Sequence, residues 1–97
     1  MEEKLTYQDI VLLNIARARK KVNYEEIKIL TGNSFTKKQI FNITDNLQRR
    51  NLIKKIGDGF ILNIKNIEKI KFILKEKWES NWEGEWINTF NKEVKNA

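Results

Sequence analysis

The fold is decided by residues 36–64, TKKQIFNITDNLQRRNLIKKIGDGFILNI. Thr36 and Gln39 stand three residues apart at the start of this stretch, a capping-box pattern that predicts the beginning of a helix. Farther along, Gly57 and Gly59 interrupt two short apolar runs, and glycines at such a place permit the positive φ of a hairpin turn. The stretch therefore predicts one helix followed directly by a two-stranded hairpin.

The predicted helix has an apolar face and a polar face. Its apolar positions, spaced by three and four residues, are directed to the core: Ile40, Ile43 and Leu47, with Thr44 beside them. The outward face then carries Lys38, Asn42, Asp45 and Arg49, with Phe41 and Asn46 on its flanks. This outward face is polar and can donate hydrogen bonds.

The hairpin is predicted over Leu52–Ile56 and Phe60–Ile64, with Gly57-Asp58-Gly59 as a three-residue loop. If Gly59 takes the bulge position, the alternation of side chains along strands predicts one buried face. That face would hold Leu52, Ile56, Phe60, Leu62 and Ile64. Lys55 would point outward.

A first helix is predicted upstream, because Thr6 and Asp9 form another capping-box-like pattern, and the helix is expected to run to about Lys20. Its apolar residues fall on two sides, Val11, Leu12, Ile15 and Ala18 on one and Ile10 and Leu13 on the other. A helix with a single buried face needs fewer apolar residues, so we expect other groups to pack against this helix on two sides.

A short second helix is predicted from Asn23, with Glu26 at its third position and Gly32 as a left-handed stop. Its inward residues are expected to be Ile27 and Leu30, with Ile29 as a further candidate.

A fourth helix is predicted from Ile67, capped by Asn66. Its apolar residues recur every four positions: Ile70, Leu74, Trp78, Trp82, Trp86 and Phe90. Because such a stripe drifts about 40° at each step, it winds around a straight helix. We expect an irregularity at Gly84.

The order of three helices, a hairpin and a last helix resembles the winged helix-turn-helix family, in particular MarR-like prokaryotic and archaeal regulators. The core of the resemblance is Gln39–Ile53, QIFNITDNLQRRNLI, where a patterned helix ends in leucine and charged residues before Leu-Ile enters the wing. Asn51 stands where members of the family usually carry glycine, and asparagine also tolerates the left-handed conformation. The resemblance covers about residues 5–64 and concerns the fold.

The resemblance implies that the third helix enters the major groove of double-stranded DNA while the wing contacts the backbone or minor groove. Carried over by position, the DNA-binding residues would be Lys37, Lys38, Asn42, Arg49, Lys54 and Lys55. Asparagine suits adenine, and lysine or arginine suits guanine and phosphate. An ordinary solvated helix face is the alternative interpretation of the same residues.

Composition narrows the classes of function. The 97 residues carry a net charge of +6, and residues 17–75 hold 15 Lys and Arg against five acidic residues, while both ends are acidic. A one-sided basic zone is typical of a polyanion binder. The chain has neither histidine nor cysteine, so the usual zinc ligands, imidazole base and thiolate nucleophile are missing. We therefore expect that the chain is not an enzyme and that it binds no metal ion or cofactor.

The chain is expected to be intracellular and cytoplasmic, associated with the nucleoid. Its longest uncharged apolar run is Ile10–Leu13, too short for a membrane span, and Met1-Glu2-Glu3-Lys4 does not resemble a secretory signal. The high share of Ile, Lys and Asn indicates an AT-rich genome, such as that of an archaeon or a mobile element.

The chain is expected to form one structural unit, a winged helix-turn-helix part over residues 1–65 and a C-terminal helical extension over 66–97. The segment with the tryptophans is net acidic, so core packing or self-association is favoured over base stacking. Packing against the surplus apolar side of the first helix, within the chain or in a homodimer, would involve Leu12, Ile15, Trp78, Trp82 and Trp86.

Three functions stay open from the sequence. The first is a transcriptional regulator that binds duplex DNA. The second is a winged-helix module that binds protein, slightly favoured by the exposed flank position of Phe41. The third is a non-specific chromatin or replication accessory protein.

Overall fold

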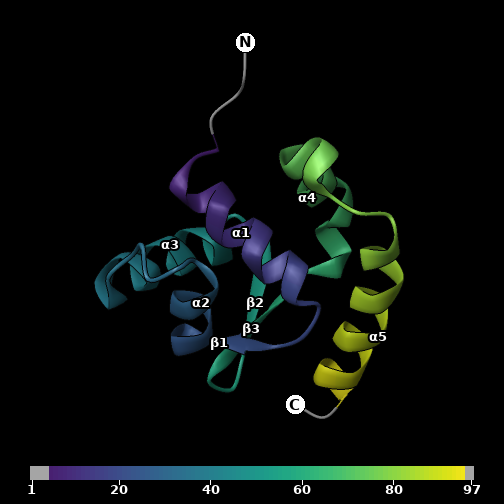
Figure 1. The fold of residues 1–97 in the computed structure, drawn as a ribbon. Coiled ribbons are helices and arrows are strands. Elements are labelled where there is room, and N and C mark those ends of the chain that lie inside the picture. Colours follow the sequence, from purple (N-terminus) through teal and green to yellow (C-terminus); the bar gives the residue numbers. More distant parts are fainter. Residues whose placement is uncertain (1–4, 96–97) are drawn as a thin grey trace.

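The structure is a computed structural model that describes residues 5–95 (Figure 1). Residues 1–4, part of the argument against a secretory signal, lie outside this range. The elements in chain order are α1 (Tyr7–Ala18), β1 (Val22–Asn23), α2 (Tyr24–Leu30), α3 (Lys37–Arg49), β2 (Ile53–Ile56), β3 (Gly59–Leu62), the 3-10 turn η1 (Ile64–Asn66), α4 (Ile67–Leu74), the 3-10 turn η2 (Lys75–Lys77) and α5 (Asn81–Lys95). The chain is mainly helical with a small three-stranded antiparallel sheet.

The three predicted capping boxes at the starts of α1, α2 and α3 are confirmed. At α3, for example, the backbone N–H of Gln39 donates to Thr36 Oγ1 at 3.1 Å, and the backbone N–H of Thr36 donates to Gln39 Oε1 at 2.8 Å. Each box satisfies two backbone donors that the first turn of a helix leaves free. The helix starts are therefore encoded locally.

The end of α3 also agrees with the prediction from the sequence. Asn51 adopts a left-handed φ of 60°. The backbone N–H of Asn51 donates to the carbonyl of Gln48 at 2.9 Å, and that of Leu52 donates to the carbonyl of Leu47 at 3.0 Å. This is the Schellman arrangement, and both leucines are fully buried. Asparagine thus replaces the glycine usual at this position.

The sheet contains one strand that the sequence pattern did not predict. Its order is β1-β3-β2, and Val22 and Asn23 of β1 pair with Phe60 and Gly59 of β3. A strand of two residues with a single buried side chain, Val22, is too short to produce an alternation that can be recognised.

The predicted three-residue loop is wrong. Ile56 pairs with Gly59, which leaves a two-residue loop in which Gly57 has a φ of 61°. Gly59 lies in the ladder instead of a bulge, and a Cβ there would be 2.7 Å from Lys21 Cγ and 3.1 Å from the carbonyl oxygen of Val22. Glycine is therefore needed at this position because β1 approaches closely.

The predicted burial of the hairpin is correct in part. Leu52, Phe60 and Leu62 are buried and Lys55 is exposed, while Ile56 and Ile64 are half-buried. All four residues of β3 are buried, Ile61 included, because β3 is the central strand and both α1 and α5 pack against it. Cover on both faces removes the expected alternation.

The predicted inward positions of α2 are partly wrong. Ile27 is fully buried, but Leu30 is 42% exposed and Ile29 is 68% exposed. A helix of only seven residues turns one narrow side to the core, and Ile27 occupies it.

The single C-terminal helix that was predicted is two helices. α4 ends at Leu74, Lys75 takes a φ of 53°, and α5 begins at Asn81, so the break precedes Gly84, which lies inside α5. The drift of a four-residue stripe supplies the reason, since one straight helix could not bury all of its members on one side. Asn66 makes no side-chain cap, and its Nδ2 donates to the carbonyl of Asn51 at 3.1 Å instead.

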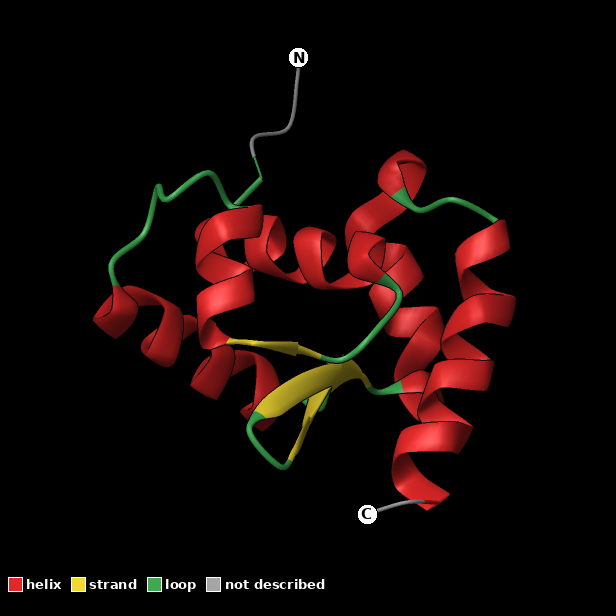
Figure 2. Ribbon diagram, turned by 60° about the horizontal axis from the view of Figure 1, so that its bottom comes forward, coloured by secondary structure: helices red, strands yellow, loops and turns green. Residues whose placement is uncertain are grey.

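The C-terminal helix packs within the chain, beside α1 and the sheet (Figures 1 and 2). Side chains from every part of the described range share one hydrophobic core, which includes four of the residues predicted for packing: Leu12, Ile15, Trp82 and Trp86. Trp78 is half-buried against that core, with its ring centroid 5.3 Å from that of Trp82. The double cover predicted for α1 is thus provided by a single chain.

No helix within residues 5–95 has both the length and the apolar character that a membrane span requires.

Candidate nucleic-acid interface

The polar face of α3 lies at the surface as predicted. Ile40, Leu47 and Thr44 are fully buried and Ile43 nearly so, which fixes the rotation of the helix about its axis. Thr44 also donates its hydroxyl to the carbonyl of Ile40 at 2.9 Å, so this polar group is satisfied inside the core. With that side held, the exposed residues of α3 include Lys37, Lys38, Asn42, Asn46 and Arg49.

The acidic C-terminal helix does not cover this face. α3 and α5 lie on opposite sides of the molecule, with α1 and the sheet between them (Figures 1 and 2). The carboxylates of α5 pair instead with basic side chains near them: Glu85 with Arg19 at 2.9 Å, and Glu93 with Lys21 at 3.9 Å. The positive potential of α3 is therefore not screened by these acids.

Two of the predicted DNA-binding residues are held in exposed ion pairs. Lys37 Nζ lies 3.2 Å from Glu25 Oε1, and Arg49 lies 3.1 Å from Asp45 Oδ2, one helical turn away. In both pairs the basic side chain is about three-quarters exposed. Exposed pairs of this kind contribute only about 0–1 kcal/mol, so a phosphate can displace the carboxylate at low cost.

The β2–β3 hairpin brings Lys55 toward α3 and leaves Lys54 apart. Successive residues of a strand point to opposite faces of the sheet. Lys55 pairs with Phe60, and its Nζ lies 5.9 Å above the ring of Tyr24, whereas Lys54 pairs with Ile61 on the other face. Both lysines are exposed, but only Lys55 shares the α3 side of the sheet.

An aromatic chain connects α3, α2 and the hairpin, and the sequence did not reveal it. Tyr24, the first residue of α2, stacks on Phe41 with centroids 6.2 Å apart and meets the edge of Phe60 at 5.1 Å. Phe60 is fully buried, while Phe41 is 56% exposed. No spacing rule links positions 24, 41 and 60, because they meet only when the three elements are assembled.

A shallow groove of about 520 Å³ lies beside the rings of Tyr24 and Phe41. It is lined by Asn23, Tyr24, Glu25, Lys37, Lys38, Phe41 and Asp58. The groove thus joins the start of α3 to the tip of the hairpin, and its walls combine two aromatic rings with two lysines and two carboxylates.

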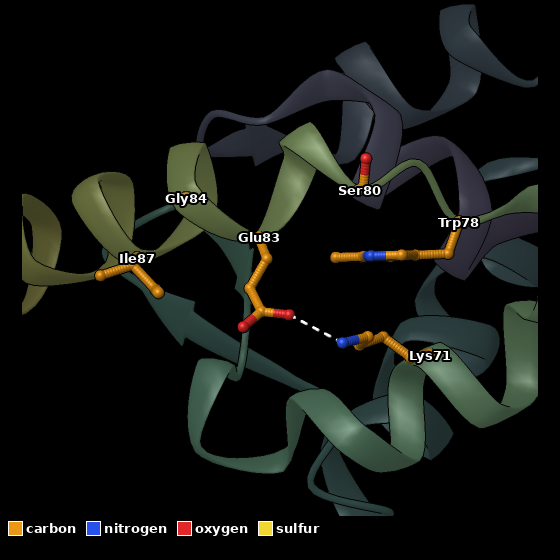
Figure 3. A pocket seen from close by; sticks show the side chains of 6 residues that line it. All are labelled: Lys71, Trp78, Ser80, Glu83, Gly84 and Ile87. Carbon is orange, nitrogen blue, oxygen red and sulfur yellow. Dashed lines mark hydrogen bonds and ion pairs between the residues drawn. The ribbon is translucent and has the colours of Figure 1, made fainter.

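A second hollow, of about 540 Å³, lies between α4 and α5 (Figure 3). Lys71 and Glu83 point toward one another across it, with Nζ 2.9 Å from Oε1, and the side chain of Trp78 lies beside them. This ion pair raises the pKa of Lys71 above its ordinary value, mainly through the hydrogen bond to Glu83. The ammonium group of Lys71 and the carboxylate of Glu83 thus neutralise one another in this hollow.

Among residues 5–95, no three acidic side chains gather into a group that could hold a metal ion. Comparison of the chain with protein-family models, with curated proteins and with solved structures found no match.

Proposed function

We propose that this chain is a winged helix-turn-helix protein that binds duplex DNA through α3 and regulates transcription. The observation that carries the proposal is the exposed, basic and hydrogen-bonding face of α3, with Lys38, Asn42 and Arg49 at the surface. The element order from α1 to β3 is compatible with that fold. The face lies away from the acidic helix α5, as a DNA-binding surface requires (Figure 1).

Each group has a role that its chemistry supports. In this proposal, Asn42 makes a bidentate contact with adenine, and Lys38 contacts guanine or phosphate. Lys37, at the first turn of α3, binds phosphate after leaving Glu25, and the positive end of the helix strengthens that contact. Lys55 on the hairpin adds a backbone contact, while Lys54, on the other face, contributes less.

The direct test is selection of bound duplexes from a random pool, followed by titration of the selected duplex at several salt concentrations. Log affinity should fall linearly with log salt, because each phosphate contact releases counterions. Asn42→Ala should lower the preference for the selected duplex over random DNA by about 5- to 150-fold, which corresponds to about 1–3 kcal/mol for one good base contact. Lys92→Ala, an exposed lysine of α5, is the matched control and should change little.

The alternatives predict different results. A chain with no affinity for duplex DNA, or with affinity that does not depend on salt, would contradict the proposal. Equal affinity for selected and random duplexes would support a non-specific accessory protein.

The second candidate function is a winged-helix module that binds protein, favoured by the exposed ring of Phe41 beside the groove. Changing Lys37 and Lys38 together to alanine separates the two functions. The DNA-binding proposal expects the double variant to lose its retention on a phosphate-rich column. A complex with a protein partner that survives the same change would favour the protein-binding module.

The homodimer stays a prediction. Trp82 and Trp86 are buried within the chain, so a dimer interface must draw on other residues. Sedimentation at micromolar concentration, where a monomer has a mass of 11.6 kDa, tests it.

A further inference from the structure

Phe41 is an apolar side chain on a polar helix face, and it is 56% exposed. It stands next to Asn42 in α3, on the flank that faces the groove with Lys37 and Lys38. A bound molecule that covers this ring would remove apolar surface from water. An apolar feature on that molecule would therefore complement Phe41.

The ring of Phe41 is held in place before anything binds. Tyr24 stacks on it at an interplanar angle of 24°, and Tyr24 is in turn held by the edge of the buried Phe60. Lys55 lies above the ring of Tyr24. A side chain fixed in this way loses little rotational freedom on binding, so more of the contact energy is available for discrimination.

The edges of base pairs in the major groove present one apolar group, the 5-methyl group of thymine. Resting on the function proposed above, we propose that Phe41 selects thymine by contacting this methyl group, next to the base that Asn42 contacts. The two side chains are consecutive on α3, about 1.5 Å apart along its axis, so both reach the same short segment of sequence. Phe41 and Asn42 together therefore favour DNA sites that contain A·T base pairs.

The test replaces each thymine of the selected duplex, one at a time, with deoxyuridine, which removes only the methyl group. We expect a loss of affinity of about fourfold at one or two positions, the amount that corresponds to burying one methyl group. In Phe41→Ala the same positions should bind thymine and uracil equally well. Phe41→Leu should keep part of the difference, because leucine retains some of the apolar contact.

Phe72→Ala is the matched control, since Phe72 is 77% exposed and lies on α4. It should keep the full difference between thymine and uracil. Phe41 is also too exposed for its removal to unfold the chain, which circular dichroism would verify.

The outcomes separate the two proposals. Failure to select or bind any duplex overturns the proposed function and this inference with it. Salt-dependent, selective binding that is insensitive to uracil in the parent chain overturns this inference alone. Retention of the uracil effect in Phe41→Ala, or its loss in Phe72→Ala, also overturns it.

Discussion

The indole N–H of Trp86 donates a 2.7 Å hydrogen bond to the carbonyl oxygen of Ala16, and both residues are fully buried. Ala16 lies in the last turn of α1, where helix carbonyls have no partner within the helix. Thr89 Oγ1 donates to the carbonyl of Arg19, the residue that follows α1, at 2.9 Å. The C-terminal helix thus caps α1, and it also covers the apolar side that α1 exposes away from α3.

Trp86→Phe should lower the free energy of unfolding by about 1–3 kcal/mol, because the carbonyl of Ala16 would be left buried without a donor. Urea unfolding followed by circular dichroism measures the change. Thr89→Val is the matched comparison and should cost less, since the exposed carbonyl of Arg19 can accept a hydrogen bond from water. Equal losses for the two variants would contradict a buried cap.

Asn51 offers a second test of a helix end. Its φ of 60° suits glycine or asparagine but not a β-branched residue. Asn51→Val should lower the free energy of unfolding by about 1–2 kcal/mol. Asn51→Gly should stay within about 1 kcal/mol of the parent, because the backbone carbonyl that accepts from Asn63 and Asn66 remains. A valine variant as stable as the parent would show that the strain is absent.

The features that could be predicted from the sequence are those set within one element. Thr36 and Gln39 lie three residues apart, and the inward set led by Ile40 recurs within one helix, so local spacing contains the information. The exposed positions of Lys38, Asn42 and Arg49 follow from that inward set.

The features that could not be predicted depend on contacts between elements. Gly57 and Gly59 both suited a turn, and it is the pairing of Gly59 with Ile56 and with Asn23 of β1 that places Gly59 in the ladder. The predicted buried face of the hairpin did not include Ile61, yet Ile61 is fully buried because α1 and α5 both pack against β3. Tyr24 gave no signal of its role, because Phe41 and Phe60 are distant in sequence.

Glu26 predicts a dependence of stability on pH. Its side chain accepts from the backbone N–H of Asn23 at 3.1 Å and lies 3.3 Å from Lys20 Nζ, and these two hydrogen bonds, the first being the larger effect, lower the pKa of Glu26. Because the pKa of Glu26 is lower in the folded state, its ionised carboxylate stabilises the fold fully above the ordinary pKa of about 4.5. This stabilisation is lost as the pH falls through the lower pKa of the folded state.

Glu26→Gln should keep the capping geometry, because glutamine also completes a capping box. At neutral pH we expect a loss below about 1 kcal/mol, since the pair with Lys20 is exposed. The variant should lose less stability than the parent when the pH is lowered below 4.5. Thermal unfolding at pH 7 and pH 3.5 measures both effects, and parallel losses in the two proteins would contradict the role of Glu26.

Asp45 supplies the last prediction, which depends on the proposed DNA-binding function. Its carboxylate lies 3.1 Å from Arg49 on the outward face of α3, so it holds that guanidinium and would repel phosphate. Asp45→Asn should therefore raise the affinity for duplex DNA about threefold to tenfold, and it should make the salt dependence steeper by about one phosphate contact. Its effect on stability should be small, about 0.3–0.5 kcal/mol, as for other exposed pairs one helical turn apart.

The matched control is Glu79→Gln, which neutralises an exposed acid just before α5 and changes the net charge equally. If both variants strengthen binding to the same degree, the gain comes from net charge and not from the release of Arg49. If Asp45→Ala, which also removes the acceptor oxygen that asparagine keeps, weakens binding to the selected duplex but not to random DNA, Asp45 accepts a hydrogen bond from a cytosine of the site. Repulsion of phosphate, by contrast, acts on every duplex alike, so titration of both duplexes decides between the two roles.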